Sequence, residues 1–271
     1  MKKCLCYLVF LLHFFSANAQ KNCTTPNETF KADEQLYYKT YYSWGAIWLS
    51  AAEGSFSTQF VQLNGRNLYH IIGSGFTYSK YDWLYVVNDK YESYIDTLTL
   101  KPLRFIREVH EGGNHVHDDF VFNQQKNKVY TSEQKGHEPG KFDSVAITPC
   151  TIDVLTAVLQ VRCLDFSLYK INDTIPISFV LDNKVYSSYI RYLGKETIKT
   201  DVLGNVRCIK FRAKLIDGTL FKAGEGMTVW VTDDKNKMPV YVETPILVGI
   251  IKVYLSKYSG LRNKIESVVP K

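Results

Sequence analysis

Apolar and polar residues alternate along most of the chain, which is the pattern of β-strands that bury one face. Clear examples are the stretches 53–63, 103–111 and 184–194, which read EGSFSTQFVQL, LRFIREVHE and KVYSSYIRYLG. Turn residues separate such stretches, and Asn64-Gly65 is a strong hairpin signal. The 19 tyrosines and 15 phenylalanines also favour strands, whose pleated faces they fill. The pattern predicts a mainly β fold, a curved antiparallel sheet or open half-barrel of about a dozen strands.

One segment, residues 148–166, has the spacing of an α-helix instead. Thr148 is the predicted N-cap and Pro149 the first helical residue, a combination typical of helix starts. Asp153, Thr156 and Arg162 could form a polar cluster, but we favour their interpretation as capping and surface residues of this helix. Its apolar stripe must be covered, and the predicted sheet is the element that can cover it. We therefore expect one α-helix packed on the sheet.

The first residues read as a secretory signal peptide over 1–19. Lys2 and Lys3 precede an apolar run shorter than the roughly 20 residues of a membrane-spanning helix, and cleavage is expected after Ala19. No later stretch is long and apolar enough to span a bilayer. We expect export to the periplasm as a single β-rich domain over residues 20–260, which could divide into two halves near 135–148. Residues 261–271 are predicted to form a flexible tail.

The charge of the chain argues against one class of partner. The formal net charge is +6, and it falls to +4 when Lys2 and Lys3 leave with the signal peptide. The remaining basic residues form no block. Because nucleic-acid binding depends on concentrated positive charge, nucleic acid is not an expected partner. The oligomeric state is left open.

Four cysteines remain after the signal peptide, and export permits disulfides. Cys150 and Cys163 are predicted at opposite ends of the helix, about 20 Å apart, which is too far for a bond. Cys208 is therefore expected to pair with one of these two, if it pairs at all. Together with Cys23, their spacing matches no zinc site.

Histidines and carboxylates gather in residues 107–120, REVHEGGNHVHDDF. If Gly112-Gly113 is a two-residue turn, His110 faces His115 across the hairpin, and side chains alternate between its two faces. One face then carries a cluster that could bind zinc or copper, made of His110, His115, His117 and Asp119. The alternative, which the residues favour, is the solvated tip of an ordinary hairpin.

The other face of this hairpin is the predicted core face. It carries Phe105, Val109 and Phe120, which are apolar. Arg107 and Asp118 also fall on this face and are predicted to lie opposite each other at its margin.

Aromatic residues dominate residues 37–48, YYKTYYSWGAIW. On one extended strand, Tyr42, Trp44 and Trp48 would share a face. Such a row could stack on sugar rings or line a lipid groove, so these three are the candidate ligand-binding residues. The alternative is that the aromatic residues simply belong to the core.

Motifs of known chemistry are absent from the sequence. It contains no nucleophile elbow, Walker loop, dinucleotide-binding fingerprint, HExxH motif or calcium loop. A binding or structural protein is therefore favoured over an enzyme, without excluding one, and no cofactor is expected.

The closing segment 229–255, VWVTDDKNKMPVYVETPILVGIIKVYL, resembles the bacterial exported domain of unknown function family 3108. The similar features are Trp230, the pair Asp233-Asp234, Pro239 and Gly249. The Tyr-rich opening DEQLYYKTYYSWGAIWLSAAEGSF and the middle helix fit as well, so the resemblance spans roughly 30–255. It implies an envelope-located β fold similar to the helix-plugged half-barrels of lipoprotein carriers. It implies no established activity and no catalytic residues.

These observations lead to one functional expectation and two alternatives. We expect a non-catalytic envelope protein that binds an apolar or amphipathic ligand, such as a lipid, a lipoprotein segment or a glycan, on a concave β surface. The first alternative is a metal-binding or metal-dependent protein that uses the histidine hairpin. The second is a structural partner in an envelope assembly.

Overall fold

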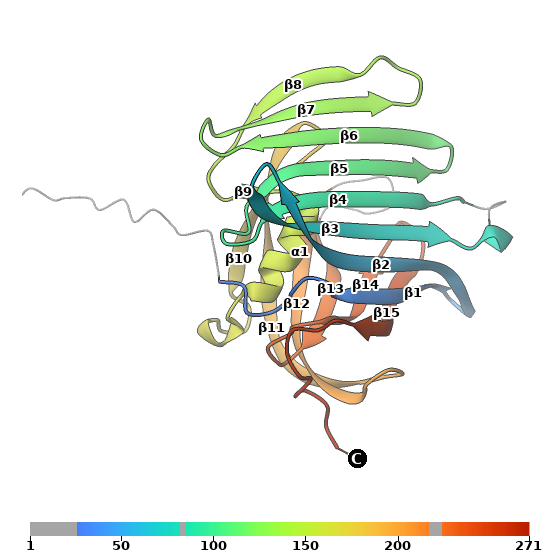
Figure 1. Ribbon diagram of the computed structural model, residues 1–271. Coiled ribbons are helices and arrows are strands. Elements are labelled where there is room, and N and C mark those ends of the chain that lie inside the picture. Colours follow the sequence, from blue (N-terminus) through green and yellow to red (C-terminus); the bar gives the residue numbers. More distant parts are fainter. Residues whose placement is uncertain (1–25, 82–84, 217–223, 271) are drawn as a thin grey trace, which may run out of the picture.

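The computed structural model describes residues 26–81, 85–216 and 224–270, so the predicted signal peptide and Cys23 lie outside the described residues. The described strands form one sheet of 15 strands (Figure 1). Their bounds are β1 (Gln35–Trp44), β2 (Ile47–Leu63), β3 (Arg66–Thr77), β4 (Asn88–Asp96), β5 (Pro102–Glu111), β6 (Asn114–Asn123), β7 (Lys128–Lys135), β8 (Lys141–Ala146), β9 (Thr151–Ile152), β10 (Thr174–Leu181), β11 (Lys184–Thr200), β12 (Gly204–Leu215), β13 (Gly224–Thr232), β14 (Pro239–Pro245) and β15 (Ile250–Ser259).

The order of the strands follows from hairpins at nearly every step. It runs β8-β7-β6-β5-β4-β3-β2-β1-β15-β14-β13-β12-β11-β10-β9, and neighbours are antiparallel except β9 and β10. The sheet thus has two wings: β1 to β8 form the first wing, β9 to β15 form the second, and the pairing of β1 with β15 joins them. The predicted mainly β, antiparallel, open fold is confirmed, with more strands than expected.

The chain crosses from one wing to the other between β8 and β9, whereas a division of the domain near 135–148 stays a prediction. The sheet's two edges are β8 and β9, which are consecutive in the sequence, so the chain passes from one edge to the opposite one there. Only three elements interrupt the strands in the described part of the chain: α1 (Val154–Cys163) and the 3₁₀ turns η1 (Ser79–Tyr81) and η2 (Phe166–Leu168). Helix α1 lies inside the curve of the sheet (Figure 1).

Helix α1 starts later than the sequence suggested. Its N-cap is Asp153, whose side chain accepts a hydrogen bond from the Thr156 N–H. Thr148 and Pro149 were predicted to begin the helix, and that prediction is wrong. The chain between them and Asp153 is extended, because Thr151 and Ile152 pair with β10 as strand β9.

Two apolar stripes of α1 explain how the helix fills the half-barrel. Leu155, Leu159 and Cys163 pack into a core with Phe105 and Phe120 of the first wing. The helix approaches that wing closely, because a Cβ added to Gly73 of β3 would lie only 3.1 Å from the Leu155 side chain. The second stripe, which includes Val154, Val158 and Val161, faces the second wing.

The end of α1 is held by a buried ion pair. Arg162 donates to both carboxylate oxygens of Glu34, at 2.6 and 2.9 Å, and each of the two side chains is 1% exposed. Arg162 also donates to the backbone oxygen of Asn236, between β13 and β14. The surface position predicted for Arg162 is therefore wrong, because this guanidinium joins α1, the start of β1 and a turn of the second wing.

The capping residues of α1 are buried too, although they were predicted at the surface. Asp153 also accepts from Ser93 of β4 and from the Thr156 hydroxyl, at 2.7 and 2.6 Å. Burial raises the pKa of Asp153, and its hydrogen bonds oppose that rise. Both ends of the helix are thus fixed by buried polar contacts to the sheet.

The C-terminal segment, expected to be a flexible tail, packs on the second wing instead. The Arg207 N–H donates to the Ser267 oxygen, and the Val269 N–H donates to the Asn205 oxygen, both at 2.9 Å. Asn236 donates to the backbone oxygens of Asn263 and Lys264. Residues 267–269 therefore lie antiparallel to the start of β12, where Val268 pairs with Val206, and we call residues 261–270 the C-terminal strap.

Cys208 forms no disulfide, so neither of the two pairings considered for it occurs. Cys208 and Cys163 are free and buried, whereas Cys150 is disulfide-bonded to a partner that is not among the described residues. Burial raises the pKa of Cys208 to about 12, so its thiol stays protonated and unreactive. Cys150 precedes β9 and does not lie on the helix, so the predicted helical separation from Cys163 does not apply.

We predict that Glu34→Ala lowers the free energy of unfolding by about 3–5 kcal/mol, because it leaves the charge of Arg162 buried without its partner. Urea unfolding followed by circular dichroism measures the change. The control is Glu138→Ala, which removes an exposed pair with Lys141 and should cost less than about 1 kcal/mol. Equal losses in the two variants would contradict the prediction.

Candidate functional site

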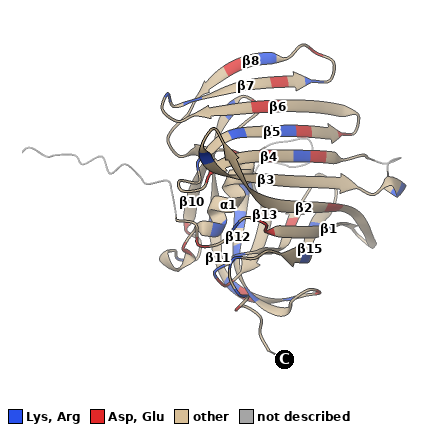
Figure 2. Cartoon of the chain, in the orientation of Figure 1, with Lys and Arg blue, Asp and Glu red and all other residues tan. Residues whose placement is uncertain are grey.

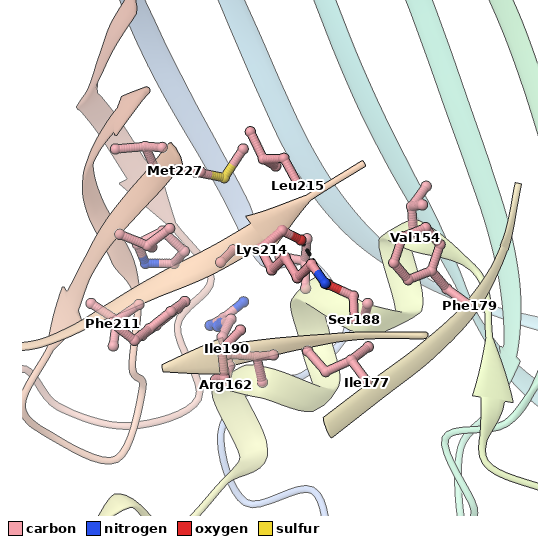
Figure 3. Close-up of a pocket in the computed structure, with 18 of the residues that line it drawn as sticks. Val154, Arg162, Ile177, Phe179, Ser188, Ile190, Phe211, Lys214, Leu215 and Met227 are labelled. Atoms are coloured by element: carbon pink, nitrogen blue, oxygen red, sulfur yellow. Dashed lines mark hydrogen bonds between the residues drawn. The ribbon is translucent and has the colours of Figure 1, made fainter. Parts of the chain in front are cut away.

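An apolar cavity of about 520 Å³ lies between α1 and the second wing. This volume is within the roughly 300–1,000 Å³ of small-molecule sites. Helix α1, the first two strands and strands β10 to β15 all contribute to its wall. Figure 3 shows side chains from both the helix and the strands, and the apolar ones include Val154, Ile177, Phe179, Ile190, Phe211 and Met227.

The deep end of the cavity contains polar groups that are already engaged. The charge of Arg162 is neutralised by Glu34, and the Tyr38 hydroxyl donates to the Pro239 oxygen at 3.2 Å. Burial raises the pKa of Tyr38, so the phenol stays neutral. Ser188, also in the wall, donates to the backbone oxygen of Lys214 at 2.6 Å (Figure 3). The cavity is thus suited to apolar groups, which it would hold by shape and burial.

The cavity extends along the strands to one end of the half-barrel. Its wall includes Leu181, the last residue of β10, together with Leu215 and Ile216 at the end of β12. Because the strands are antiparallel, β1 and β14 end at this same margin, where β2, β13 and β15 begin. We call this margin the rim. The deep end near Arg162 lies at the opposite end of the strands.

The histidine hairpin has the predicted register. His110 pairs with His115 and Glu108 with His117, around the Gly112-Gly113 turn. The core face is also as predicted, since Phe105 and Phe120 are fully buried.

The side chains of the hairpin are arranged around Glu108. The imidazoles of His115 and His117 both hydrogen-bond to the Glu108 carboxylate, and the rings of His110 and His115 stack with centroids 4.2 Å apart. Asp119 instead accepts two hydrogen bonds from Arg104, at 2.9 and 2.6 Å. The histidines and Asp119 are thus occupied by other partners, and a metal site at this hairpin stays a prediction.

A different acidic cluster lies on the inner side of the same hairpin. Oxygen atoms of Asp118, Glu133 and Asp182 lie within 4.8 Å of one another, the one such grouping of three potential metal ligands within the described ranges. Arg107 lies among them, with its Nη2 2.5 Å from both Asp118 Oδ2 and Asp182 Oδ1. Arg107 and Asp118 lie opposite each other, as predicted. Asp182 comes from the turn between β10 and β11, so its contact with Arg107 joins the two wings.

Burial makes Asp118 an unusual acid. Its side chain is fully buried, and burial raises its pKa from 3.8 to about 6, against the opposing effect of Arg107. Glu133 adds to the rise. An acid with a raised pKa binds its proton more tightly in the folded chain, so its contribution to stability is greatest at low pH and is lost as pH rises.

We predict that the free energy of unfolding contributed by Asp118 falls by up to about 3 kcal/mol as pH rises from 4 to 7, given its pKa of about 6. Asp118→Asn should remove this part of the pH dependence. Urea unfolding of both proteins at several pH values measures the difference. Asp119→Asn, on the solvated face, is the control and should leave the slope between pH 4 and 7 close to that of the unaltered chain.

The aromatic candidates lie at the rim, outside the cavity wall. The chain reverses at Gly45-Ala46, so Trp48 pairs with Ser43 and does not continue the strand that carries Tyr42 and Trp44. The predicted single row is therefore wrong. Trp48 instead lies on the outer face, stacked on Tyr41 with ring centroids 5.3 Å apart. A ligand-binding role for Tyr42, Trp44 and Trp48 stays a prediction.

The sequence of α1 contains a signal for the cavity. Val154, Ala157, Val158 and Val161 follow one another at helical spacing and all line the cavity. The sequence predicts a single apolar stripe on this helix. A second stripe on the same helix could have indicated that α1 has two apolar environments and not one.

Comparison with known proteins agrees with this architecture. A crystal structure of a β-barrel-like protein of domain of unknown function DUF1849 from Brucella abortus is similar, with a TM-score of 0.57 and 11% identity over 85% of this chain and 99% of that chain. At this identity the likeness shows the fold alone. No curated protein matches the chain.

The fold and cavity thus define a β-barrel-like protein with a helix inside its curve. The model of the family described as "Protein of unknown function (DUF3108)" matches residues 36–256, so the chain belongs to that family. The resemblance seen in the sequence is confirmed. The described residues include no helix long and apolar enough to cross a membrane.

Proposed function

We propose that this protein is an exported, periplasmic binding protein that holds an apolar or amphipathic ligand in the cavity beside α1. The observation that carries the proposal is the apolar cavity of about 520 Å³, whose wall reaches the rim. Protein interiors are normally packed without voids of this size, so an apolar cavity that reaches the rim is better explained by an occupant than by the needs of folding. Predicted export at residues 1–19 supports the periplasmic location.

The polar contacts of the cavity favour one class of ligand over others. Arg162 and Tyr38 are engaged by Glu34 and Pro239, so neither offers a free charge to a ligand. A glycan would leave many hydroxyl groups without partners in such a wall. We therefore infer that the occupant is an acyl chain or an acylated polypeptide, with its apolar part in the cavity and any polar part toward the rim.

We predict that Ala157→Trp, which fills the cavity from the helix, weakens binding of dansyl-labelled undecanoic acid by at least about tenfold. Dansyl fluorescence titrations measure the affinity, and native mass spectrometry shows whether the purified protein carries a lipid adduct that this variant lacks. Val121→Trp is the matched control, because Val121 lies on β6, where its side chain is 46% exposed and outside the cavity wall. Near-ultraviolet circular dichroism checks that both variants fold.

Two results would contradict the proposed function. One is an unaltered protein that binds no dansyl-labelled acid and carries no adduct. The other is equal affinity in Ala157→Trp and the unaltered protein, which would place the probe elsewhere.

A further inference from the structure

Five large apolar side chains at the rim are exposed. Trp44, Ile47 and Trp48 lie at the turn between β1 and β2, and Leu247 and Val248 lie at the turn between β14 and β15, each with an exposure of 42% to 59%. We call these five residues the apolar tip. Single exposed apolar residues are common on protein surfaces, but a group of large ones marks a site that contacts another molecule or a membrane.

The two turns are packed against each other. Ser43 of β1 pairs with Ile250 of β15, so the turns leave the sheet side by side. Gly249 has a positive φ of 89°, and a Cβ there would lie 2.6 Å from the Ser43 oxygen and 2.8 Å from the Tyr42 ring. Only glycine permits this approach without displacing β1. The apolar tip is therefore one surface built from two turns.

The apolar tip has no polar face. Trp48 points to the outer face with Tyr41, whereas Trp44 shares the other face of β1 with Tyr42. Residues 41–52 and 245–251 contain no charged residue, and Figure 2 shows the turn between β1 and β2 free of charged positions. A strand with one solvated face alternates with polar residues. A tip that is apolar on both faces is suited to insertion.

Cations stand just behind the tip. Lys252 of β15 lies with its Nζ 5.4 Å from the centre of the Trp48 ring and 3.5 Å from a carboxylate oxygen of Glu243, with which it is paired. Lys80 is exposed in η1, and the preceding Tyr78 donates its N–H to the Ala51 oxygen of β2, which brings η1 beside the start of that strand. Tryptophan prefers the boundary between acyl chains and headgroups, and lysine can extend its amine from there to anionic headgroups.

We propose that the apolar tip docks on the surface of a lipid bilayer. Tryptophan on both faces, uncharged turns and lysines set one layer back match the order of acyl chains, interface and headgroups. Docking would bring the rim against the membrane, next to the cavity wall at Leu215 and Ile216. The docking itself does not depend on the proposed function; only the idea that ligand moves between membrane and cavity rests on it.

The test uses vesicles of phosphatidylethanolamine and phosphatidylglycerol in equal amounts and the mature protein. We expect the unaltered protein to sediment with the vesicles. In Trp44→Ser/Trp48→Ser, the fraction of protein bound to the vesicles should be at least about fivefold lower. Leu247→Ser/Val248→Ser should lose binding as well, without altering a tryptophan. The matched control is Phe60→Ser/Leu63→Ser on β2, because these side chains are similarly exposed, at 55% and 54%, toward the opposite end of the strand.

Several outcomes would overturn the proposal. These are an unaltered protein that ignores the vesicles, tip variants that bind as well as the control, or a dimer that the tip variants convert to monomer without any vesicle binding. The last result would make the tip an interface between two copies. Ala157→Trp should bind vesicles normally but lose affinity for the dansyl-labelled acid. The tip variants should lose vesicle binding but keep their affinity for the acid. The two proposals can therefore fail independently.

Discussion

The architecture depends on the buried pair of Arg162 and Glu34. A helix inside a curved, open sheet needs contacts of defined geometry to set its position, and the buried pair supplies one of them. Here one guanidinium at the end of α1 contacts the start of β1 and the turn before β14, so it joins the helix to both wings. Asn236 then connects that turn to the C-terminal strap. A charge pair in this position costs desolvation, and its geometry specifies where the helix sits.

With the helix fixed, its two apolar stripes meet different environments. The stripe of Leu155 and Leu159 is packed tightly into the first wing, where Gly73 allows close contact. The stripe of Val154 and Val158 faces a second wing that curves away, and the cavity lies between them. The same helix is therefore both the plug of the half-barrel and one wall of its cavity. A binding site of this kind arises from incomplete closure and needs no catalytic group.

The two ends of the half-barrel differ in character. The deep end carries the ion pair of Arg162 with Glu34 and the C-terminal strap. The rim near β1 and β15 carries exposed apolar turns instead. Arg107 contacts Asp182 and so joins the two wings across the half-barrel. Arg107 also contacts Asp118, whose pKa is raised, so this group of polar contacts responds to pH. The contact with Asp182 lies at the turn after Leu181, so the two wings are joined at the rim as well as at the deep end.

The sequence by itself determined the elements and the family. Alternation predicted the antiparallel sheet, the Gly112-Gly113 turn predicted the register of the histidine hairpin, and the closing segment indicated the family, because each depends on neighbours in the chain. Only the tertiary structure decided which polar residues are buried. Glu34 and Arg162 are 128 positions apart, and Arg107 and Asp182 are 75 apart, so no local pattern pairs them. The cavity is likewise not predicted by any local pattern, because its walls come from strands and a helix that meet only when the sheet curves.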